Sequence, residues 1–214
     1  MEKRMVKLYA RNNGKVALHA IPGHFATSHS HINFYIDMTS LKTRMNEAQE
    51  VAKSLAGDYV DSTVIDTIVC MDGTEVVGAY LAQEFTRRGF PNTNLHDTIY
   101  VVTPEYNANN QLIFRDNTIP AINGKNVVLL LATTTTGLTV RRSLDCVQYY
   151  GGKTRGISSI FSTVKSVTGM PVHSVFTGED VPGYQAFSRN ECPFCKKGLR
   201  IEAMVNGFGY SKLI

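Results

Sequence analysis

A run of threonines after an apolar segment is the strongest chemical signal in the sequence. Residues 126–131 are almost all apolar, as in a strand buried on both faces, and Ala132 follows them. The next residues are Thr133, Thr134, Thr135, Thr136, Gly137, Leu138 and Thr139. If a helix starts near Leu138, backbone N–H groups and hydroxyls meet at its N-terminus, where the helix dipole favours a phosphate, and Gly137 lets the backbone approach it. The pattern predicts a phosphate site; a threonine-rich turn that only caps a helix is the alternative.

A second loop of the same kind follows residues 64–71. These residues are rich in β-branched side chains, which is typical of a strand. The turn after them contains Asp72, Gly73, Thr74 and Glu75, and a helical pattern over 75–88 begins within it. As in the threonine loop, the tight turn between the strand and the helix directs backbone N–H groups toward an anion. Taken alone the signal is weak, because any strand–helix unit can show it.

Two closely spaced cysteines form a different kind of candidate site. Cys192 and Cys195 belong to Cys-Pro-Phe-Cys, which two lysines and a glycine follow. Such a turn points both sulfurs at one metal, so Zn²⁺ is a candidate cofactor. A closed site needs four ligands, and Cys70 and Cys146 fall in predicted core elements. The other ligands would come from a histidine such as His173 or from a second subunit; a plain thiol turn and a redox pair are the alternatives.

Four of the six histidines lie close together in the sequence, at His19, His24, His29 and His31. Histidine-rich segments can bind metals, but no carboxylates at suitable spacing accompany these four. We therefore expect them to be hydrogen-bond donors near a ligand rather than metal ligands.

The periodicity of the sequence predicts the elements that position these loops. Helices are expected at 41–56, 75–88 and 138–150, the first capped by Ser40, with closing glycines at Gly57, Gly89 and Gly151–Gly152. Strands are expected at 64–71, 98–102, 126–131, 156–162 and 172–177. Strands alternating with helices indicate parallel pairing, so the fold class is α/β with a mostly parallel open sheet flanked by helices. Ligands bind such sheets beyond the carboxyl ends of the strands, where both candidate loops lie.

Composition restricts the function further. The chain has 214 residues, 43% of them hydrophobic and 19% charged, so it can bury the core of one domain. A net charge of +4 without a charge cluster argues against a nucleic-acid partner. No apolar run is long enough for a membrane span, and residues 1–10 lack the apolar core of a signal peptide. Four cysteines do not make a disulfide framework, and we expect a cytoplasmic location.

The threonine loop resembles the motif with which type I phosphoribosyltransferases bind phosphoribosyl diphosphate (PRPP). That motif has four hydrophobic residues, two acids, two small or apolar residues and then Thr-Thr-Gly-x-Thr, which Thr135–Thr139 match without a gap. In the family this loop holds the 5′-phosphate, and the two acids hold the ribose hydroxyls. The acids fall at Leu131 and Ala132 here, a departure that concerns catalysis more than fold.

Two further segments are similar to orotate phosphoribosyltransferases within this family. Residues 27–37 resemble the N-terminal segment that covers the active site, with Ser28 and Phe34–Asp37 as matches and Thr27 in place of a lysine. Phe34 and Tyr35 are therefore candidates for contacting the base, since aromatic faces stack on planar heterocycles; an ordinary strand with core aromatics is the alternative. Residues 70–82 resemble the family's diphosphate loop and the helix after it.

The resemblance also implies an organisation and a set of roles. It implies one phosphoribosyltransferase-like domain over 1–214, with a hood at 1–40, an α/β core at 58–178 and a C-terminal extension at 179–214. It implies that Asp72–Glu75 bind diphosphate, that Mg²⁺ bridges diphosphate and ribose oxygens, and that the protein is a homodimer. The family's mobile catalytic loop corresponds to 104–124, where Arg115 is the only cation. Arg115 could clamp a diphosphate oxygen or be a surface arginine beside Asp116.

The implied function is transfer of the phosphoribosyl group from PRPP to a pyrimidine-type base with release of diphosphate. The expected partners are PRPP or another sugar phosphate and a nucleobase. Loss of the two acids and of the usual loop lysine leaves a second hypothesis, a non-catalytic regulator of the same fold that binds a nucleotide or a sugar phosphate. The retained phosphate loop and hood fit both hypotheses.

Overall fold

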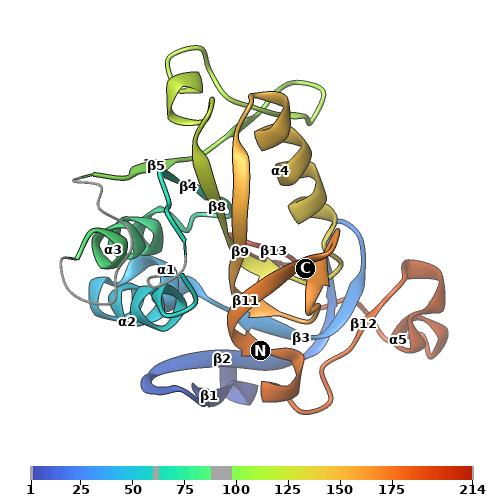
Figure 1. Ribbon diagram of the computed structural model, residues 1–214. Coiled ribbons are helices and arrows are strands. Elements are labelled where there is room, and N and C mark those ends of the chain that lie inside the picture. The colour runs from blue at the N-terminus through green and yellow to red at the C-terminus, as the bar shows by residue number, and fades with distance from the viewer. Residues whose placement is uncertain (1, 60–62, 88–97, 214) are drawn as a thin grey trace.

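A mostly parallel sheet lies at the centre of the fold (Figure 1), which a computed structural model describes for residues 2–59, 63–87 and 98–213. Over these residues the sheet has six strands, in the order β10 (Ser166–Val167), β11 (Met170–Thr177), β9 (Lys153–Ser162), β8 (Asn126–Thr134), β4 (Thr67–Cys70) and β5 (Tyr100–Val102). Every neighbouring pair is parallel except β10 with β11. The predicted α/β class and parallel pairing are therefore confirmed.

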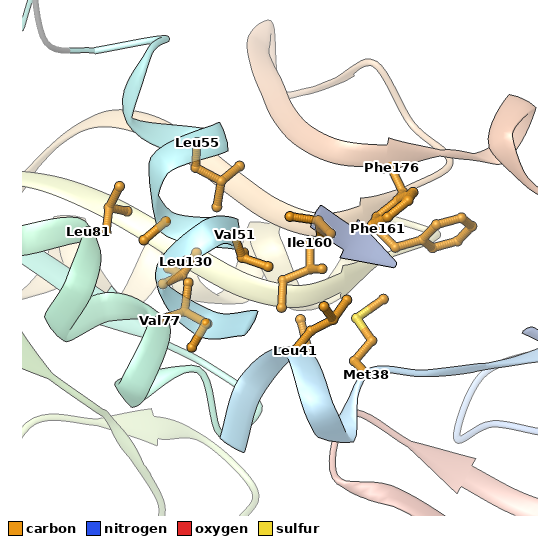
Figure 2. Packing of buried hydrophobic residues seen from close by; sticks show 14 of the residues in the cluster. Met38, Leu41, Val51, Leu55, Val77, Leu81, Leu130, Ile160, Phe161 and Phe176 are labelled. Atoms are coloured by element: carbon orange, nitrogen blue, oxygen red, sulfur yellow. The ribbon is translucent and has the colours of Figure 1, made fainter. Parts of the chain in front are cut away.

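Helices cover both faces of this sheet, as predicted. The helices α1 (Thr39–Thr43), α2 (Met45–Ala56) and α3 (Glu75–Thr86) lie on one face, and α4 (Leu138–Tyr149) lies on the other (Figure 1). Because side chains alternate along a strand, Leu130 of β8 packs with the first three helices, whereas Leu129 and Leu131 pack with α4. Figure 2 shows the first of these clusters, in which Leu130 lies near Val51 and Val77. Apolar side chains thus hold β8 from both sides.

The helix predicted over 41–56 begins earlier and is interrupted. The backbone N–H of Thr39 donates to Asp37 Oδ1 (2.9 Å) where α1 starts. Arg44 then adopts an extended conformation (φ −97°, ψ 129°) that separates α1 from α2. Ser40 therefore lies inside the first turn and does not cap the helix, so the predicted start is wrong by two residues.

The glycines expected to close the helices behave differently from one another. Gly57 after α2 is right-handed (φ −55°). A glycine that closes a helix is expected to be left-handed, so this expectation is wrong for Gly57. Gly151 after α4 is left-handed (φ 80°) and donates to Gln148 O (2.9 Å), as predicted. The predicted helix end at Arg88 and Gly89 lies outside the described residues.

The central strand β8 is longer than the predicted strand over 126–131. Its parallel ladder with β9 continues to the pairs Thr133–Phe161 and Thr134–Ser162. The first two threonines therefore belong to the strand, and the connecting loop starts at Thr135. The strand predicted over 64–71 is shorter in the structure, where β4 covers Thr67–Cys70.

A second sheet joins the two ends of the chain, and the sequence analysis did not predict it. Its strands lie in the order β12 (Ala186–Phe187), β3 (His31–Asp37), β2 (Asn13–Ala26), β13 (Ala203–Asn206) and β14 (Gly209–Lys212), and β1 (Val6–Ala10) also pairs with β2. The parallel pairing of β2 with β13 places Phe25 opposite Ala203. The hood and the C-terminal extension therefore share one sheet.

The remaining elements are short. The strands β6 (Glu105–Tyr106) and β7 (Leu112–Ile113) form a hairpin, and α5 (Pro193–Lys196) contains most of the Cys-Pro-Phe-Cys turn. Short 3₁₀ helices occupy Glu2–Arg4, Ile119–Ala121, Gly178–Asp180 and Arg189–Glu191. No helix in the described part of the chain is both long and apolar enough to cross a membrane.

Candidate functional site

A cavity of about 440 Å³ lies beyond the carboxyl ends of β4 and β8. Its floor consists of Asp72 and Thr133–Thr139, and its cover includes Thr27–Ser30, Tyr35, Tyr184 and Val205–Gly207. The volume is within the range of ordinary small-molecule sites. The two predicted loops therefore meet where an open parallel sheet is expected to bind a ligand.

The threonine loop connects β8 to α4 and lines the floor over its whole length. Thr163 holds it from outside, because its N–H donates to Thr134 O (2.9 Å) and its hydroxyl donates to Thr135 O (2.9 Å). The first N–H groups of a helix lack partners within the helix. Over the described residues, α4 has no capping side chain, and Leu138 N makes only a long contact with Thr136 Oγ1 (3.5 Å). Backbone donors and hydroxyls are thus available to an anion in the cavity.

Gly137 sets the geometry of this loop. It is left-handed (φ 72°) and immediately precedes α4. A Cβ atom at this position would lie 2.9 Å from Val167 Cγ2, which is closer than real Cβ contacts come. Both the backbone conformation and the available space therefore require glycine at this position.

The turn after β4 forms the rest of the floor. Asp72 (φ 57°) and Gly73 (φ 75°) are consecutive left-handed residues, and the buried Thr74 hydroxyl donates to Met71 O (2.8 Å). Of the four residues predicted to bind diphosphate, Asp72 lines the cavity. The other three, Gly73, Thr74 and Glu75, shape the turn and the start of α3 without lining the cavity.

Lys42 connects the floor to the cover. Its Nζ donates to Asp72 O (2.6 Å) and to Gly207 O, and it lies 5.6 Å from the ring centroid of Phe208. A Cβ atom at Gly207 would lie 2.5 Å from Asp72 Cβ, so the β13–β14 turn sits directly on the Asp72 turn. Burial lowers the pKa of Lys42 and raises the pKa of Asp72, while the charge of each group opposes the shift of the other.

The adjacent aromatics Phe34 and Tyr35 point to opposite faces of β3. Tyr35 lines the cavity and contacts the rings of Phe25 and Tyr210 edge-on, with centroids 6.1 and 5.3 Å away. Burial raises the pKa of Tyr35, so its hydroxyl stays protonated. Phe34 packs against the main core cluster and does not line the cavity. Strand alternation therefore brings one of the two predicted aromatics to the site.

Arg115 does not line the cavity. Its Nε and Nη2 donate to Glu105 Oε2 (2.9 and 2.8 Å), in an exposed pair across the β6–β7 hairpin. Its partner is Glu105 and not Asp116, the neighbour considered from the sequence. The same hairpin brings Tyr106 and Asn110 to the cavity. Arg115 is thus placed as a surface arginine.

Several residues that line the cavity were not predicted from the sequence. Arg142 lies three residues after Thr139, on the same side of α4, so helical spacing could have found it. Tyr184 and Val205–Gly207 come from the C-terminal extension, and no local pattern relates them to the threonine loop. Arg142 supplies the permanent positive charge among the described lining residues.

The positions of the family's two acids are buried in β8. Leu131 and Ala132 are 0% and 1% exposed, and neither lines the main cavity. Among the described residues, Asp72 is the only carboxylate that does. Mg²⁺ prefers an octahedral set of oxygen ligands, so this donor set does not fit a Mg²⁺ site held by the protein.

Cys192 and Cys195 belong to a cluster of four side chains with metal-ligating atoms, whose other members are His24 and His31. This corrects the sequence analysis, which separated the histidines from the cysteines and considered His173 or a second subunit as the source of ligands. His173 instead lies 3.3 Å from the Asp58 carboxylate. The four side chains come together because strands from both ends of the chain pair in the second sheet.

Neither a family model nor a curated protein matches the sequence. Among solved structures, an orotate phosphoribosyltransferase from Mycobacterium tuberculosis in complex with Fe(III) dicitrate matches with 15% identity and a TM-score of 0.50, over 76% of this chain and 91% of that chain. A phosphoribosyltransferase from Corynebacterium diphtheriae matches with 13% identity and a TM-score of 0.51, over 76% and 90%.

An adenine phosphoribosyltransferase from Thermoanaerobacter pseudethanolicus matches with 15% identity and a TM-score of 0.50, over 82% of this chain and 96% of that chain. At such low identity these likenesses concern the fold alone. The chain has the fold of the type I phosphoribosyltransferases.

Proposed function

We propose that the chain binds PRPP and transfers its phosphoribosyl group to a pyrimidine-type base, with release of diphosphate. The observation that carries the proposal is the threonine loop on the cavity floor, where Gly137 and the start of α4 offer backbone donors beside hydroxyl groups. The shared fold supports it, because the neighbours with this fold are phosphoribosyltransferases. The choice of a pyrimidine-type base rests on the likeness of residues 27–37 to the hood of orotate phosphoribosyltransferases.

In this reaction a base nitrogen loses its proton to solvent and forms a bond to the anomeric carbon of PRPP, while the bond from that carbon to a diphosphate oxygen breaks. The threonine loop fixes the 5′-phosphate and thereby positions the anomeric carbon. Arg142 supplies positive charge for the leaving diphosphate. Tyr35 offers aromatic surface to the base. Catalysis by these residues is positional and electrostatic.

A diphosphate-release assay with PRPP and a panel of orotate, uracil and adenine tests the proposal. Diphosphate release with orotate or uracil, and slower release with adenine, is expected. Arg142→Gln should lower kcat/KM by about 10- to 100-fold, because a charge-assisted hydrogen bond contributes about 1.5–3 kcal/mol.

Arg141→Gln is the matched control for this assay, because Arg141 is exposed like Arg142 but does not line the cavity. Its kcat/KM should stay within about twofold of wild type, as for a surface change away from special features. Equal losses in the two variants would contradict the assignment of Arg142.

A non-catalytic regulator that binds the same class of ligand is the second candidate. The burial of Leu131 and Ala132 and the pairing of Arg115 with Glu105 favour it, since they remove the acids and the loop cation from the cavity. Ribose 5-phosphate would then bind nearly as tightly as PRPP, with little effect of Mg²⁺, and no base would release diphosphate. Calorimetry with both ligands, with and without Mg²⁺, together with the assay, separates the two candidates.

A further inference from the structure

Four side chains from the two ends of the chain meet next to the cavity cover. His24 lies near the end of β2, and His31 is the first residue of β3. Cys192 immediately precedes α5, and Cys195 lies within it. Their ligand atoms all lie within 4.8 Å of one another. His24, His31 and Cys192 are buried (3%, 7% and 0% exposed), so the cluster is an interior feature that Cys195 closes toward solvent.

The spacing of the four ligand atoms matches a tetrahedral zinc ion. With Zn–N bonds of about 2.0–2.1 Å and Zn–S bonds of about 2.3 Å, tetrahedral geometry places two nitrogens about 3.3 Å apart and a nitrogen and a sulfur about 3.6 Å apart. His24 Nε2 lies 3.1 Å from His31 Nδ1. Cys195 Sγ lies 3.6 Å from His24 Nε2 and 3.3 Å from His31 Nδ1, and Cys192 Sγ lies 3.4 Å from His24 Nε2.

Contacts around the cluster orient the ligands as metal sites require. His24 Nδ1 lies 3.0 Å from Leu199 O, so this nitrogen donates its proton to the carbonyl and Nε2 keeps a free lone pair toward the cluster. The Phe194 ring stacks on His24, with centroids 5.2 Å apart. Gly198 (φ 69°) donates to Cys195 O (2.9 Å) and closes the turn that carries both cysteines.

We propose that His24, His31, Cys192 and Cys195 bind one structural zinc ion that joins the hood to the C-terminal extension. Two thiolates and two imidazoles form a soft donor set that suits zinc, and four protein ligands leave no open position for chemistry. Thr27–Ser30, which lines the cavity, is the loop between the two histidine ligands. The zinc ion therefore also sets the shape of the cavity cover, and its effect on ligand affinity rests on the proposed function.

Elemental analysis of protein purified without added metal tests the site itself. Wild type should contain about one equivalent of zinc, as a closed structural site does. Cys195→Ser should lose it, whereas the matched controls Cys146→Ser and His19→Gln, which lie outside the cluster, should retain it. Cys195 is exposed, so its substitution leaves the buried core intact.

A measurement on wild type covers the case in which the variants do not fold. A chelator should lower Tm, and zinc but not Mg²⁺ should restore it, since metal binding is coupled to folding. Less than about a tenth of an equivalent of zinc in wild type, without zinc uptake on titration, would overturn the proposal. A Cys192–Cys195 disulfide in freshly purified protein, or iron in place of zinc, would also overturn it.

Titration of ribose 5-phosphate into the zinc-loaded and zinc-free forms tests the effect on the cover. Affinity should fall by about tenfold without zinc, within the usual range of coupling between two sites; equal affinity of the two forms would overturn this effect. Zinc in the protein without any binding of ribose 5-phosphate would leave the metal site standing and contradict the proposed function. Binding of ribose 5-phosphate by a protein that takes up no zinc would support the proposed function and overturn the metal site.

Discussion

The floor and the cover of the cavity are built in different ways. The floor consists of two loops that follow β4 and β8, and large apolar clusters on both faces of the parallel sheet hold these strands in place. The cover comes from the two ends of the chain, where β2 and β13 pair at Phe25–Ala203 and Ala26–Met204. A much smaller apolar cluster, which includes Phe25 and Tyr35, supports it.

Because the floor and the cover are built differently, different interactions stabilise them. Apolar burial holds the strands beneath the floor, and the burial of apolar surface itself depends little on pH or metal ions. The cover also has polar contacts, which include those of Lys42 with Asp72 O and Gly207 O and the cluster of His24, His31, Cys192 and Cys195. We therefore expect the cover to loosen under conditions that leave the floor folded, and the following variants test each half.

The largest effect is expected from Gly137→Val, which breaks the floor. The left-handed conformation and the 2.9 Å approach to Val167 leave no room for a side chain, so the loop must move away from the ligand. Residual strain costs about 1–3 kcal/mol of stability. Protection by ribose 5-phosphate in a thermal shift assay should disappear while circular dichroism still shows a folded protein. Equal protection of variant and wild type would remove the phosphate-loop interpretation.

The sequence predicted the floor because its chemistry is contiguous. The apolar run, Thr135–Thr139 and the start of α4 follow one another, so strand, loop and helix patterns suffice. The length of β8 was underestimated because pairing with β9, which extends it to Thr134, is a tertiary contact.

The cover could not be predicted in the same way. Cys192 and His24 are 168 residues apart in the sequence, and the pairings of β12 with β3 and of β13 with β2 in one sheet bring the chain ends together. The sequence showed an aromatic pair at Phe34 and Tyr35, but not which of the two faces the cavity, since that depends on what packs on each side of β3.

Lys42→Met loosens the cover from the floor but leaves the threonine loop in place, so it should lower stability without abolishing ligand binding, and its total effect is smaller than that of Gly137→Val. The change leaves the carbonyls of Asp72 and Gly207 without their donor, and the free energy of unfolding should fall by about 1–3 kcal/mol. Lys53→Met is the matched control, because Lys53 makes an exposed pair with Glu50 and should cost less than about 1 kcal/mol. Urea denaturation measures the free energy of unfolding of both variants. Equal losses of stability in Lys42→Met and Lys53→Met would show that Lys42 does not connect the cover to the floor.

The smallest effect is a pH dependence at Asp72. Burial raises the pKa of this carboxyl above its ordinary value of 3.8 in the folded state. Its contribution to stability is therefore fully present below the unfolded pKa and is lost as pH rises through the folded pKa. Asp72→Asn has no carboxyl to ionise, so its free energy of unfolding relative to wild type should increase as pH rises from below the ordinary pKa of 3.8 through the raised pKa of the folded state. Urea denaturation at several pH values measures the difference in the free energy of unfolding between the variant and wild type. A difference that stays constant or decreases as pH rises would contradict the burial of Asp72.

The threonine loop on the cavity floor is proposed to bind the phosphate of a phosphoribosyl compound. A crystal structure of the chain with ribose 5-phosphate tests it most directly. We expect the phosphate at the start of α4, within hydrogen-bonding distance of the backbone N–H groups of Leu138 and Thr139, and the ribose beneath the loop Thr27–Ser30. A phosphate bound elsewhere, or an empty cavity at a saturating concentration of ligand, would contradict it.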